Sequence, residues 1–230
     1  MSIKTSIWIK LAIATLTILS TETIAVAQTS IVDSPTDLVI VSKLPRFPQV
    51  AQLDRQIRPA AGAQLKPENY FISAQRKYGK KDYKGAMADY TRAIEIDPNF
   101  AQGYGGRGTV KHLQLKDYRG ALADYNRAIQ LRPDLAIVHN FRGDLKAEKL
   151  QDYQGALADY NRAIEIDQTL AIAYGGRSEL KHDRLNDRAG GIADAQQAAR
   201  LFKQQGDLEN HQIATGILRK WQQTDKKSRR

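Results

Sequence analysis

The sequence contains no cysteine, and this absence removes several kinds of chemistry at once. Without a thiol the chain can form no disulfide, offer no thiolate to a metal and use no cysteine nucleophile. Other catalytic signatures are also missing, since no HExxH pair, Walker loop or Ser/His/Asp constellation stands out. We therefore expect no enzymatic activity, no metal site and no cofactor.

Long apolar runs are scarce, and the first of them lies close to the N-terminus. Lys4 and Lys10 give a positively charged start, residues 11–20 are apolar, and Ala25-Val26-Ala27 provides a small-x-small cleavage site. The apolar run is too short and too rich in Thr to favour a stable membrane-spanning helix. The sequence predicts a signal peptide over residues 1–27, cleaved after Ala27. We expect export to the periplasm or another extracytoplasmic compartment, and an uncleaved N-terminal anchor is the alternative.

Acidic residues are too few to balance the basic ones, and the net charge is +10. The excess is unevenly distributed. Residues 67–218 carry 22 Lys/Arg against 20 Asp/Glu, whereas residues 43–66 carry five against one and residues 219–230 six against one. The body of the chain is nearly neutral, so a specific nucleic-acid partner is not expected. Membrane contact is expected only through the basic flanks or an uncleaved signal peptide.

Residues 28–66 have little that could pack. Proline interrupts any helix in this stretch, because it lacks an N–H and restricts the residue before it. The apolar run over residues 38–41 (LVIV) is short and has no pairing partner in view. We predict an extended, disordered basic linker. One alternative is that residues 38–41 fold back as a tethered ligand of the remainder.

From Pro67 onward the sequence repeats itself. Residues 120–129 read GALADYNRAI, and residues 155–164 repeat this decapeptide 35 residues later. Residues 85–94 (GAMADYTRAI) and residues 190–199 (GGIADAQQAA) are a close copy and a decayed copy at the same spacing. A period between 20 and 50 residues is typical of a stacked repeat protein.

Each repeat unit predicts a pair of helices. In the copy at 120–129, Ala121, Tyr125 and Ala128 form one apolar stripe at helical period. Asp124 and Arg127 are three residues apart and are expected to pair along the helix surface. Pro98 and Pro133 are expected to end the second helices of the first two repeats, with a sharper continuation or a looser turn where Gln168 replaces proline in the third. The predicted pairs are 67–80 with 83–96, 101–115 with 118–131, 136–150 with 153–166, and 171–185 with 188–203.

A final helix is predicted after the repeats. Asp207 can cap it, and Ile213, Ile217 and Trp221 then recur at intervals of four, with Leu218 adjacent. One apolar face on a polar helix is what the exposed end of a repeat stack requires. We predict a capping helix over residues 207–223, followed by a basic tail over residues 224–230.

The repeat pattern resembles that of the tetratricopeptide repeat (TPR) family. Tyr104, Gly108 and Tyr118, followed by the stripe Ala121, Tyr125 and Ala128, occupy the family's signature positions in the second repeat. The amino-acid sequence of the repeats, for example LQDYQGALADYNRAIEI, also resembles that of exported multi-repeat proteins abundant in cyanobacteria. The resemblance covers residues 67–203, divided as 67–100, 101–135, 136–170 and 171–203. It implies an all-α, right-handed α-solenoid of about four helix-turn-helix repeats with a C-terminal capping helix.

Two departures from the family pattern stand out. The usual period is 34 residues, and the extra residue here falls between Gly108 and Tyr118 and between Gly143 and Tyr153, which predicts a longer inter-helix turn. The fourth repeat has lost its aromatic residues, with Ala195 in place of the repeated Tyr, so we expect it to be the least stable repeat.

The resemblance also implies which residues face a ligand, because the first helices of such repeats line a concave groove. The implied groove residues are Phe71, Gln75, Gly105, Thr109, His112, Asn140, Asp144, Ala147, Gly175, Glu179 and His182. A chaperone-binding subset of the family clamps a C-terminal carboxylate with Lys and Asn. Here the corresponding positions hold Phe71, Gln75, Gly105, Thr109 and Asn140, so that clamp is not expected.

Other motifs favour structural over chemical roles. Gly103-x-Gly105-x-x-Gly108 matches the dinucleotide-binding fingerprint, but no strand precedes it and the repeat places it inside a helix. His112 and His182 occupy the same repeat position two repeats apart, which is unsuitable for shared metal binding. Arg107, Arg142 and Arg177 recur every 35 residues and are expected to pair with Asp124 and its equivalents, or else to form an anion-binding row.

The sequence therefore favours a non-catalytic protein–protein interaction scaffold. It would bind a partner protein or peptide in the groove, and assembly of an envelope or membrane complex is a suitable role. The alternative is an electrostatic adaptor that grips an anionic surface or polymer through its basic linker and tail.

Overall fold

The computed structural model describes residues 66–228, and the regular structure in that range is entirely helical. The predicted signal peptide, almost all of the predicted linker and the run at residues 38–41 lie outside the described residues. Two compact parts are described separately below. The N-terminal part comprises residues 66–132, and the C-terminal part comprises residues 133–228.

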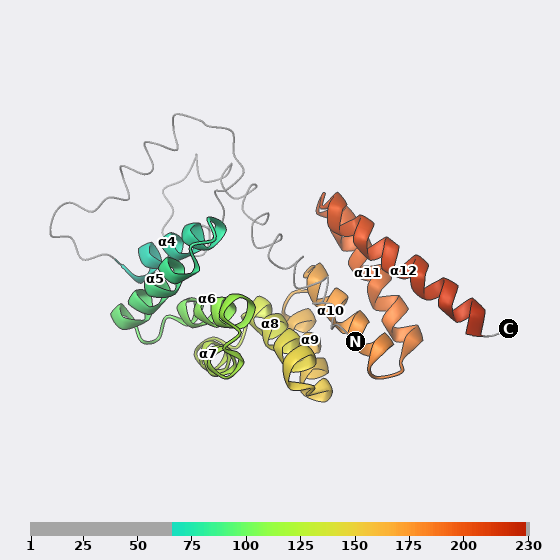
Figure 1. Cartoon of the computed structure of the whole chain (residues 1–230), viewed down its shortest axis with the longest axis horizontal. Helices are drawn as coiled ribbons and strands as arrows, with labels where there is room; N and C mark the ends of the chain where they lie inside the picture. Colours follow the sequence, from blue (N-terminus) through green and yellow to red (C-terminus); the bar gives the residue numbers. More distant parts are fainter. Residues whose placement is uncertain (1–65, 229–230) are drawn as a thin grey trace, which may run out of the picture. The chain divides into compact units, whose positions relative to one another are not determined.

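The N-terminal part contains two antiparallel helix pairs (Figure 1). Its elements are α4 (Pro67–Gly79), α5 (Tyr83–Ile96), α6 (Ala101–Val110), the π-helical turn η1 (Lys111–Leu115) and α7 (Tyr118–Leu131). Helix α6 packs against α4 and α5 as well as against its own partner α7. Adjacent pairs therefore stack, as expected for repeats whose apolar stripes need a neighbour for burial.

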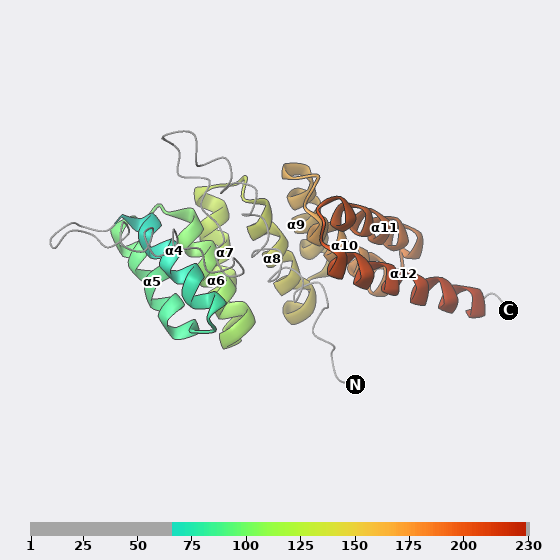
Figure 2. The ribbon, with the colours of Figure 1, turned by 90° about the horizontal axis from the view of Figure 1, so that it is seen from above.

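The C-terminal part contains two further pairs and a last helix. Its elements are α8 (Ala136–Leu145), the π-helical turn η2 (Lys146–Leu150), α9 (Tyr153–Ile166), α10 (Ala171–Asp183), α11 (Arg188–Gln204) and α12 (Leu208–Ser228). Figure 2 shows α11 and α12 lying alongside each other, and the two helices are in contact. The helix pairs predicted from the repeat spacing agree with these bounds to within two residues, and the all-α repeat fold is confirmed.

The repeated apolar stripe forms the core of every pair. Ala121, Tyr125 and Ala128 on α7 are fully buried, and the corresponding residues of α5 and α9 are 4% exposed or less. In the C-terminal part Tyr160 packs with Ala156 and Leu180, so a second helix contacts the first helix of the following pair. The decapeptide recurs because each copy must present the same stacking surface.

The extra residue of the 35-residue period does not lengthen the inter-helix turn, and that prediction was wrong. The amide of Asp82 donates to the carbonyl of Lys77, five residues earlier, whereas the amide of Asp117 donates to Lys111, six residues earlier. The added residue lies inside the π-helical turn η1, which ends at Lys116 in a left-handed conformation with φ of 57°. The turn η2 repeats this arrangement. A single inserted residue can be absorbed as one turn with i→i+5 bonding, which leaves the second helix in register.

Each second helix begins with an aspartate cap. The Oδ1 atoms of Asp82, Asp117, Asp152 and Asp187 each accept a hydrogen bond of 2.9 Å from the backbone N–H of the glycine three residues later. A Cβ on Gly155 would lie only 2.1 Å from Asp152 Oδ2. The first glycine of the decapeptide is therefore required by the cap that precedes it.

The second helices end at the same place with or without proline. Helix α5 ends at Ile96, two residues before Pro98, and α9 ends at Ile166 although Gln168 replaces the proline. The backbone and hydroxyl of Thr169 both donate to Asp167 Oδ1, at 2.8 and 2.7 Å. The looser turn predicted at Gln168 is not observed, because the aspartate provides its own turn.

Helix α12 packs against the last helix pair, α10 and α11, through the face of α12 that carries Trp221. Asp207 caps it as predicted, accepting from the backbone N–H of Asn210 at 3.1 Å. Ala214, Leu218 and Trp221 are buried, whereas Ile213 and Ile217 of the predicted face are half-buried. The helix continues to Ser228, five residues beyond its predicted end.

Candidate functional site

The predicted groove residues of the N-terminal part lie on α4, α6 and η1 and are largely packed. The ring centroid of Phe71 lies 5.6 Å from that of Tyr90 and 5.7 Å from that of Phe100, so this side chain covers the core. Gln75, one turn later on α4, is half-buried. The face of α4 therefore presents an apolar patch beside one polar side chain.

The corresponding face of α6 and η1 has a polar, buried centre. Thr109 Oγ1 donates to the backbone carbonyl of Gly105 at 3.0 Å. The hydroxyl of Tyr125 lies 3.5 Å from both Thr109 Oγ1 and His112 Nδ1. Thr109 and His112 are only 8% and 2% exposed. His112 is thus oriented by the second helix of its own repeat.

The C-terminal part places a different set of groups at the equivalent positions. The hydroxyl of Tyr160 on α9 donates to Asp144 Oδ1 at 2.7 Å, and Asn140 Nδ2 donates to Asp144 Oδ2 at 3.1 Å. Asn140 and Asp144, both on α8, are 1% and 4% exposed. The amide oxygen of Asn140 is buried and has no hydrogen-bond partner.

Two more carboxylates act on this cluster. Burial is the main reason why the pKa of Asp144 is raised well above its usual value, and the negative charges of Glu148 and Glu179 raise it further. The hydrogen bonds from Tyr160 and Asn140 oppose that change. Glu148 lies on η2 and Glu179 on α10, and both are half-buried. We call Asn140, Asp144, Glu148, Tyr160 and Glu179 the Asp144 site.

The remaining predicted groove residues lie on η2 and α10. Ala147 packs against the cluster around Tyr160, and Gly175 is buried. The ring of His182 stacks on Trp221 of α12, with centroids 3.9 Å apart and planes 9° from parallel. His182 Nδ1 lies 2.6 Å from Asp183 Oδ1. This histidine therefore contacts the last helix, which its repeat position did not indicate.

The arginine ladder joins the two helices of the second, third and fourth pairs, and in the first pair Lys77 contacts Asp89 at 2.7 Å instead. Arg107, Arg142 and Arg177 each hold an aspartate 17 residues later through two hydrogen bonds of 2.5–3.0 Å. Lys111, Lys146 and Lys181 contact the same aspartates at 2.7–2.9 Å. The structural interpretation of the ladder is confirmed. The predicted pairing of Asp124 with Arg127 was wrong, because Asp124 faces the first helix and Arg127 instead donates to Gln130.

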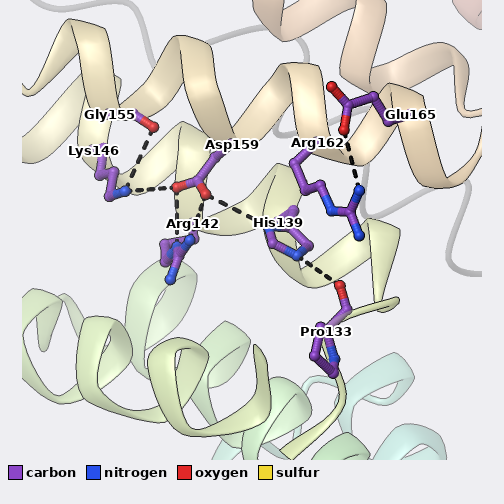
Figure 3. Close-up of polar contacts among 8 residues, drawn as sticks. All are labelled: Pro133, His139, Arg142, Lys146, Gly155, Asp159, Arg162 and Glu165. Carbon is purple, nitrogen blue, oxygen red and sulfur yellow. Dashed lines mark hydrogen bonds and ion pairs between the residues drawn. The ribbon is translucent and has the colours of Figure 1, made fainter. Parts of the chain in front are cut away.

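Figure 3 shows this network in the third repeat, around Asp159. His139 Nε2 donates to the carbonyl of Pro133 at 3.0 Å, which turns Nδ1 toward Asp159 at 3.5 Å. Burial alone would raise the pKa of Asp159, but His139, Arg142 and Lys146 outweigh it and hold the pKa well below its usual value. Asp159 is therefore ionised and fully paired.

The glycines of α6 make room for neighbouring side chains. Within the fingerprint, a Cβ on Gly103 would lie 3.0 Å from Ile94 and Phe100, and one on Gly108 would lie 2.8 Å from the ring of Tyr125. A Cβ on the adjacent Gly106 would lie 2.4 Å from the ring of Tyr90. Gly176 has the same relation to Tyr160, at 2.7 Å. The glycines allow close approach of an aromatic side chain, and nothing in this arrangement indicates a phosphate site.

Among residues 66–228 no group of three or more His, Asp or Glu side chains is arranged to hold a metal ion. No helix within that range is both long and apolar enough to cross a membrane. The Asp144 site and the stacked His182 are the polar features of the first helices that the repeat pattern alone does not explain. Sequence reasoning named Asn140, Asp144 and Glu179 individually but missed Tyr160 and Glu148 as their neighbours.

The comparisons with known proteins agree with the repeat structure. The family described as tetratricopeptide repeat matches residues 68–100, 101–135 and 138–170. No curated protein sequence is significantly similar to the chain.

Several solved structures are similar to part of the chain. The first TPR of Spaghetti (RPAP3) bound to the HSP90 peptide SRMEEVD is 21% identical, with a TM-score of 0.48 over 51% of this chain and 91% of that one. The TPR domain of Arabidopsis OM64 is 23% identical, with a TM-score of 0.47 over 51% and 95% of the two chains. MamA is 16% identical, with a TM-score of 0.49 over 67% and 95%.

Proposed function

Because the chain belongs to the tetratricopeptide repeat family, whose members are generally protein–protein interaction modules, we propose that it is a non-catalytic scaffold. It binds a partner protein or peptide on the face formed by its first helices. The observation that supports this proposal is that the repeats differ on their first helices and not in their stacking residues. The stacking residues recur in the first three pairs, whereas the equivalent positions Thr109, Asp144 and Glu179 carry three different side chains.

The mechanism of binding is preorganisation. The capped second helices and the Arg–Asp–Lys networks of the second to fourth pairs hold the first helices against their partners before any ligand arrives. A partner segment then meets a surface whose side chains are already ordered, so less conformational entropy is lost on binding. Specificity comes from the polar groups that differ between repeats.

The cellular setting belongs to the same proposal. The charged start, apolar stretch and Ala25-Val26-Ala27 site support export with cleavage after Ala27. We place the protein in the periplasm or another extracytoplasmic compartment, where it assists assembly of an envelope or membrane complex. Sequencing the N-terminus of the mature protein tests the cleavage, and a chain still starting at Met1 would contradict it.

Partner capture from the native envelope fraction tests the interaction function. The bait is the full chain, compared with a variant in which Asn140→Ala, Asp144→Asn and Glu179→Gln are combined. The matched control is Arg162→Gln with Glu165→Gln, which removes an exposed pair on α9. We expect specific partners to be lost with the first variant and retained with the control. If the same partners bind equally to the full chain, the triple variant and the control, the first-helix face is not the binding surface.

The electrostatic adaptor remains a second candidate because the positive charge is concentrated in residues 43–66 and 219–230. In that case the flanks grip an anionic lipid, polysaccharide or nucleic acid, and the repeats act as a spacer. Replacing the basic residues at positions 219, 220, 226, 227, 229 and 230 with glutamine, which keeps Trp221, and raising salt would abolish such binding, since exposed charges are screened within about 8 Å at 0.15 M salt. Binding that survives both changes excludes the adaptor.

A further inference from the structure

Helix α12 occupies the place of a first helix in a fifth repeat. It packs against α11, as α6 packs against α5 and α10 against α9. In a complete pair the first helix also packs against its own second helix. A Cβ on Gly191 of α11 would lie 2.7 Å from His182 Cβ and 2.9 Å from the carbonyl oxygen of Ser178, both on α10. Ile217 and Ile213 follow those two residues by one repeat period, so they lie on the face of α12 that a second helix would cover.

This face of α12 is left open by the described helices. Gly216 is exposed, and nothing lies within 4 Å of a Cβ added to it. Ile213 and Ile217 stay half-buried, whereas Ala214 and Trp221 are buried against the last pair. Figure 1 shows α12 at the outer edge of the C-terminal part, beside α11. The open face therefore combines two partly exposed isoleucines with a glycine that leaves space beside them.

A line of four residues runs along the open face. Glu209, Ile213, Gly216 and Lys220 are separated by four, three and four residues, which is the spacing of a coiled-coil seam. Glu209 and Lys220 are exposed at the two ends of the line, and neither forms an ion pair within the described residues. We call these four residues the α12 seam.

The α12 seam is complementary to a second copy of itself that runs antiparallel. Glu209 of one copy then lies opposite Lys220 of the other, and Ile213 lies opposite the space at Gly216. A twofold axis repeats both contacts, as in any isologous interface. A parallel arrangement would instead place Glu209 against Glu209 and Lys220 against Lys220, and like charges repel. Charge and side-chain volume therefore both favour the antiparallel pairing.

The same face is unsuited to a second helix of the repeated type. In the fourth pair, Arg177 and Lys181 of α10 hold Asp194 of α11. Gln212 and Gly216 stand one repeat period later, so α12 lacks both cations. A second helix that carried the repeated aspartate would bury a carboxylate without a counter-ion, which is unfavourable. The occupant must therefore differ from the second helices of this chain.

We propose that the α12 seam pairs with the α12 seam of a second copy of this chain, which gives an antiparallel homodimer with twofold symmetry. The seam spans about 17 Å of helix, since a helix rises about 1.5 Å per residue. An interface of this length is small, so the dimer is weak and dissociates on dilution. The pairing goes beyond the proposed function, because it concerns α12 and requires no other protein.

Sedimentation equilibrium of the full chain over a concentration series tests the pairing by charge reversal. Glu209→Lys and Lys220→Glu each place like charges opposite one another, and the double variant restores opposite charges in exchanged positions. Arg219→Glu is the matched control, since it reverses an exposed charge outside the seam and changes the net charge as Lys220→Glu does. Far-UV circular dichroism establishes that each variant is folded.

We expect each single reversal in the seam to weaken dimerisation about tenfold, because the twofold axis places it in two ion pairs. The double variant should recover the affinity of the unmodified chain to within about threefold, and Arg219→Glu should stay within the same limit. A chain that is monomeric at every concentration would overturn the proposal. So would a dimer that neither single reversal weakens, or a double variant that is as weak as the single ones.

Cysteine cross-linking tests the antiparallel register independently of charge. The chain has no cysteine, so Ile213→Cys and Gly216→Cys each introduce a unique thiol. On mild oxidation, a mixture of the two variants, one carrying a size tag, should give at least about fivefold more mixed disulfide than either like pair, since a disulfide requires Cα atoms about 4.4–6.8 Å apart. Equal yields of all three products would overturn this register.

One outcome would assign the seam to another protein. If the chain stays monomeric while Lys220→Glu removes a partner captured from the envelope fraction, the homodimer is wrong. The proposed function fails separately, because it depends on the first-helix face and its triple variant. A dimer that follows the charge reversals stands even if no partner depends on that face.

Discussion

At the scale of single residues, two aspartates of the third repeat are placed in opposite electrostatic surroundings. Asp159 is held by Arg142 and Lys146, whereas Asp144 is buried among acceptors and near other carboxylates. Folding therefore lowers the pKa of Asp159 and raises that of Asp144. The two residues should respond to substitution and to pH in opposite directions.

Substituting Asp144→Asn should stabilise the protein at neutral pH. A carboxyl whose pKa is raised by folding destabilises the folded state increasingly as pH rises above its unfolded pKa of about 3.9. Asparagine removes that ionisation and can still accept from Tyr160. We expect a higher urea midpoint at pH 7 for the variant, with the difference shrinking below pH 4. A lower midpoint at pH 7 would show that Asp144 already has a compensating cation in the unliganded protein.

Substituting Asp159→Asn should have the opposite effect and cost about 2 kcal/mol, because it leaves Arg142 and Lys146 partly buried without their shared anion. A carboxyl with a lowered pKa stabilises the fold above its unfolded pKa of about 3.9, and this stabilisation is lost as pH falls further. Urea unfolding at pH 7 and pH 3 measures both effects. The exposed Glu165→Gln should change the free energy of unfolding by less than about 0.5 kcal/mol. An equal loss in Asp159→Asn at the two pH values would contradict the explanation.

At the scale of the helix, the first glycine of the decapeptide occupies a position where alanine would disturb the helix cap. Alanine normally stabilises an exposed helical position by about 1 kcal/mol relative to glycine. At Gly155 the added Cβ would meet Asp152 Oδ2 at 2.1 Å and displace the cap. At Gly216 in α12 nothing lies within 4 Å of the added Cβ.

We therefore predict different results for two identical substitutions. At Gly155 the loss of the cap, about 1 kcal/mol, offsets the helix propensity that alanine gains, so Gly155→Ala should leave the free energy of unfolding nearly unchanged or lower it. Gly216→Ala should raise it by roughly 0.5–1 kcal/mol. Thermal unfolding followed by circular dichroism distinguishes them. Equal stabilisation by both substitutions would show that Asp152 caps the helix equally well from another rotamer.

At the scale of the whole molecule, the C-terminal helix compensates for a weakened last repeat. Ala195 replaces the tyrosine that fills the other repeats, so α10 and α11 rely on contacts from α12. Trp221 provides the largest of these, since it is 7% exposed and stacks on His182. We therefore expect Trp221 of α12 to provide the aromatic packing that the fourth repeat lost when Ala195 replaced tyrosine.

Trp221→Ala should lower the free energy of unfolding by about 3 kcal/mol, the usual cost of removing a buried aromatic side chain. Hydrogen exchange should accelerate in α10 and α11 before it does so in α9, because stability in repeat arrays is transmitted between neighbours. The exposed neighbour Gln222→Ala is the control and should behave as the unmodified chain. Uniform acceleration along residues 133–228 would argue against a local role.

The sequence by itself determined the repeating helices of this protein. Period and apolar spacing are local properties, so the helix pairs, the buried Tyr125 stripe and the Asp207 cap could all be predicted. The cap at Asp117 was also readable, because the aspartate precedes Tyr-x-Gly in the first three repeats and the same glycine in the fourth. The choice of first-helix residues as a binding surface stays a prediction, since it depends on a partner.

Only the tertiary structure decided which groups meet across helices. Asp124 pairs with Arg107, 17 residues away, and not with Arg127, three residues away, because the distance between packed helices governs the contact. The inserted residue became a π-helical turn, since the second helix had to keep its stacking register. Asn140 and Asp144 are four residues apart on α8, so their contact follows from helical spacing, whereas Tyr160 of α9 and Glu179 of α10 reach Asp144 through packing between helices.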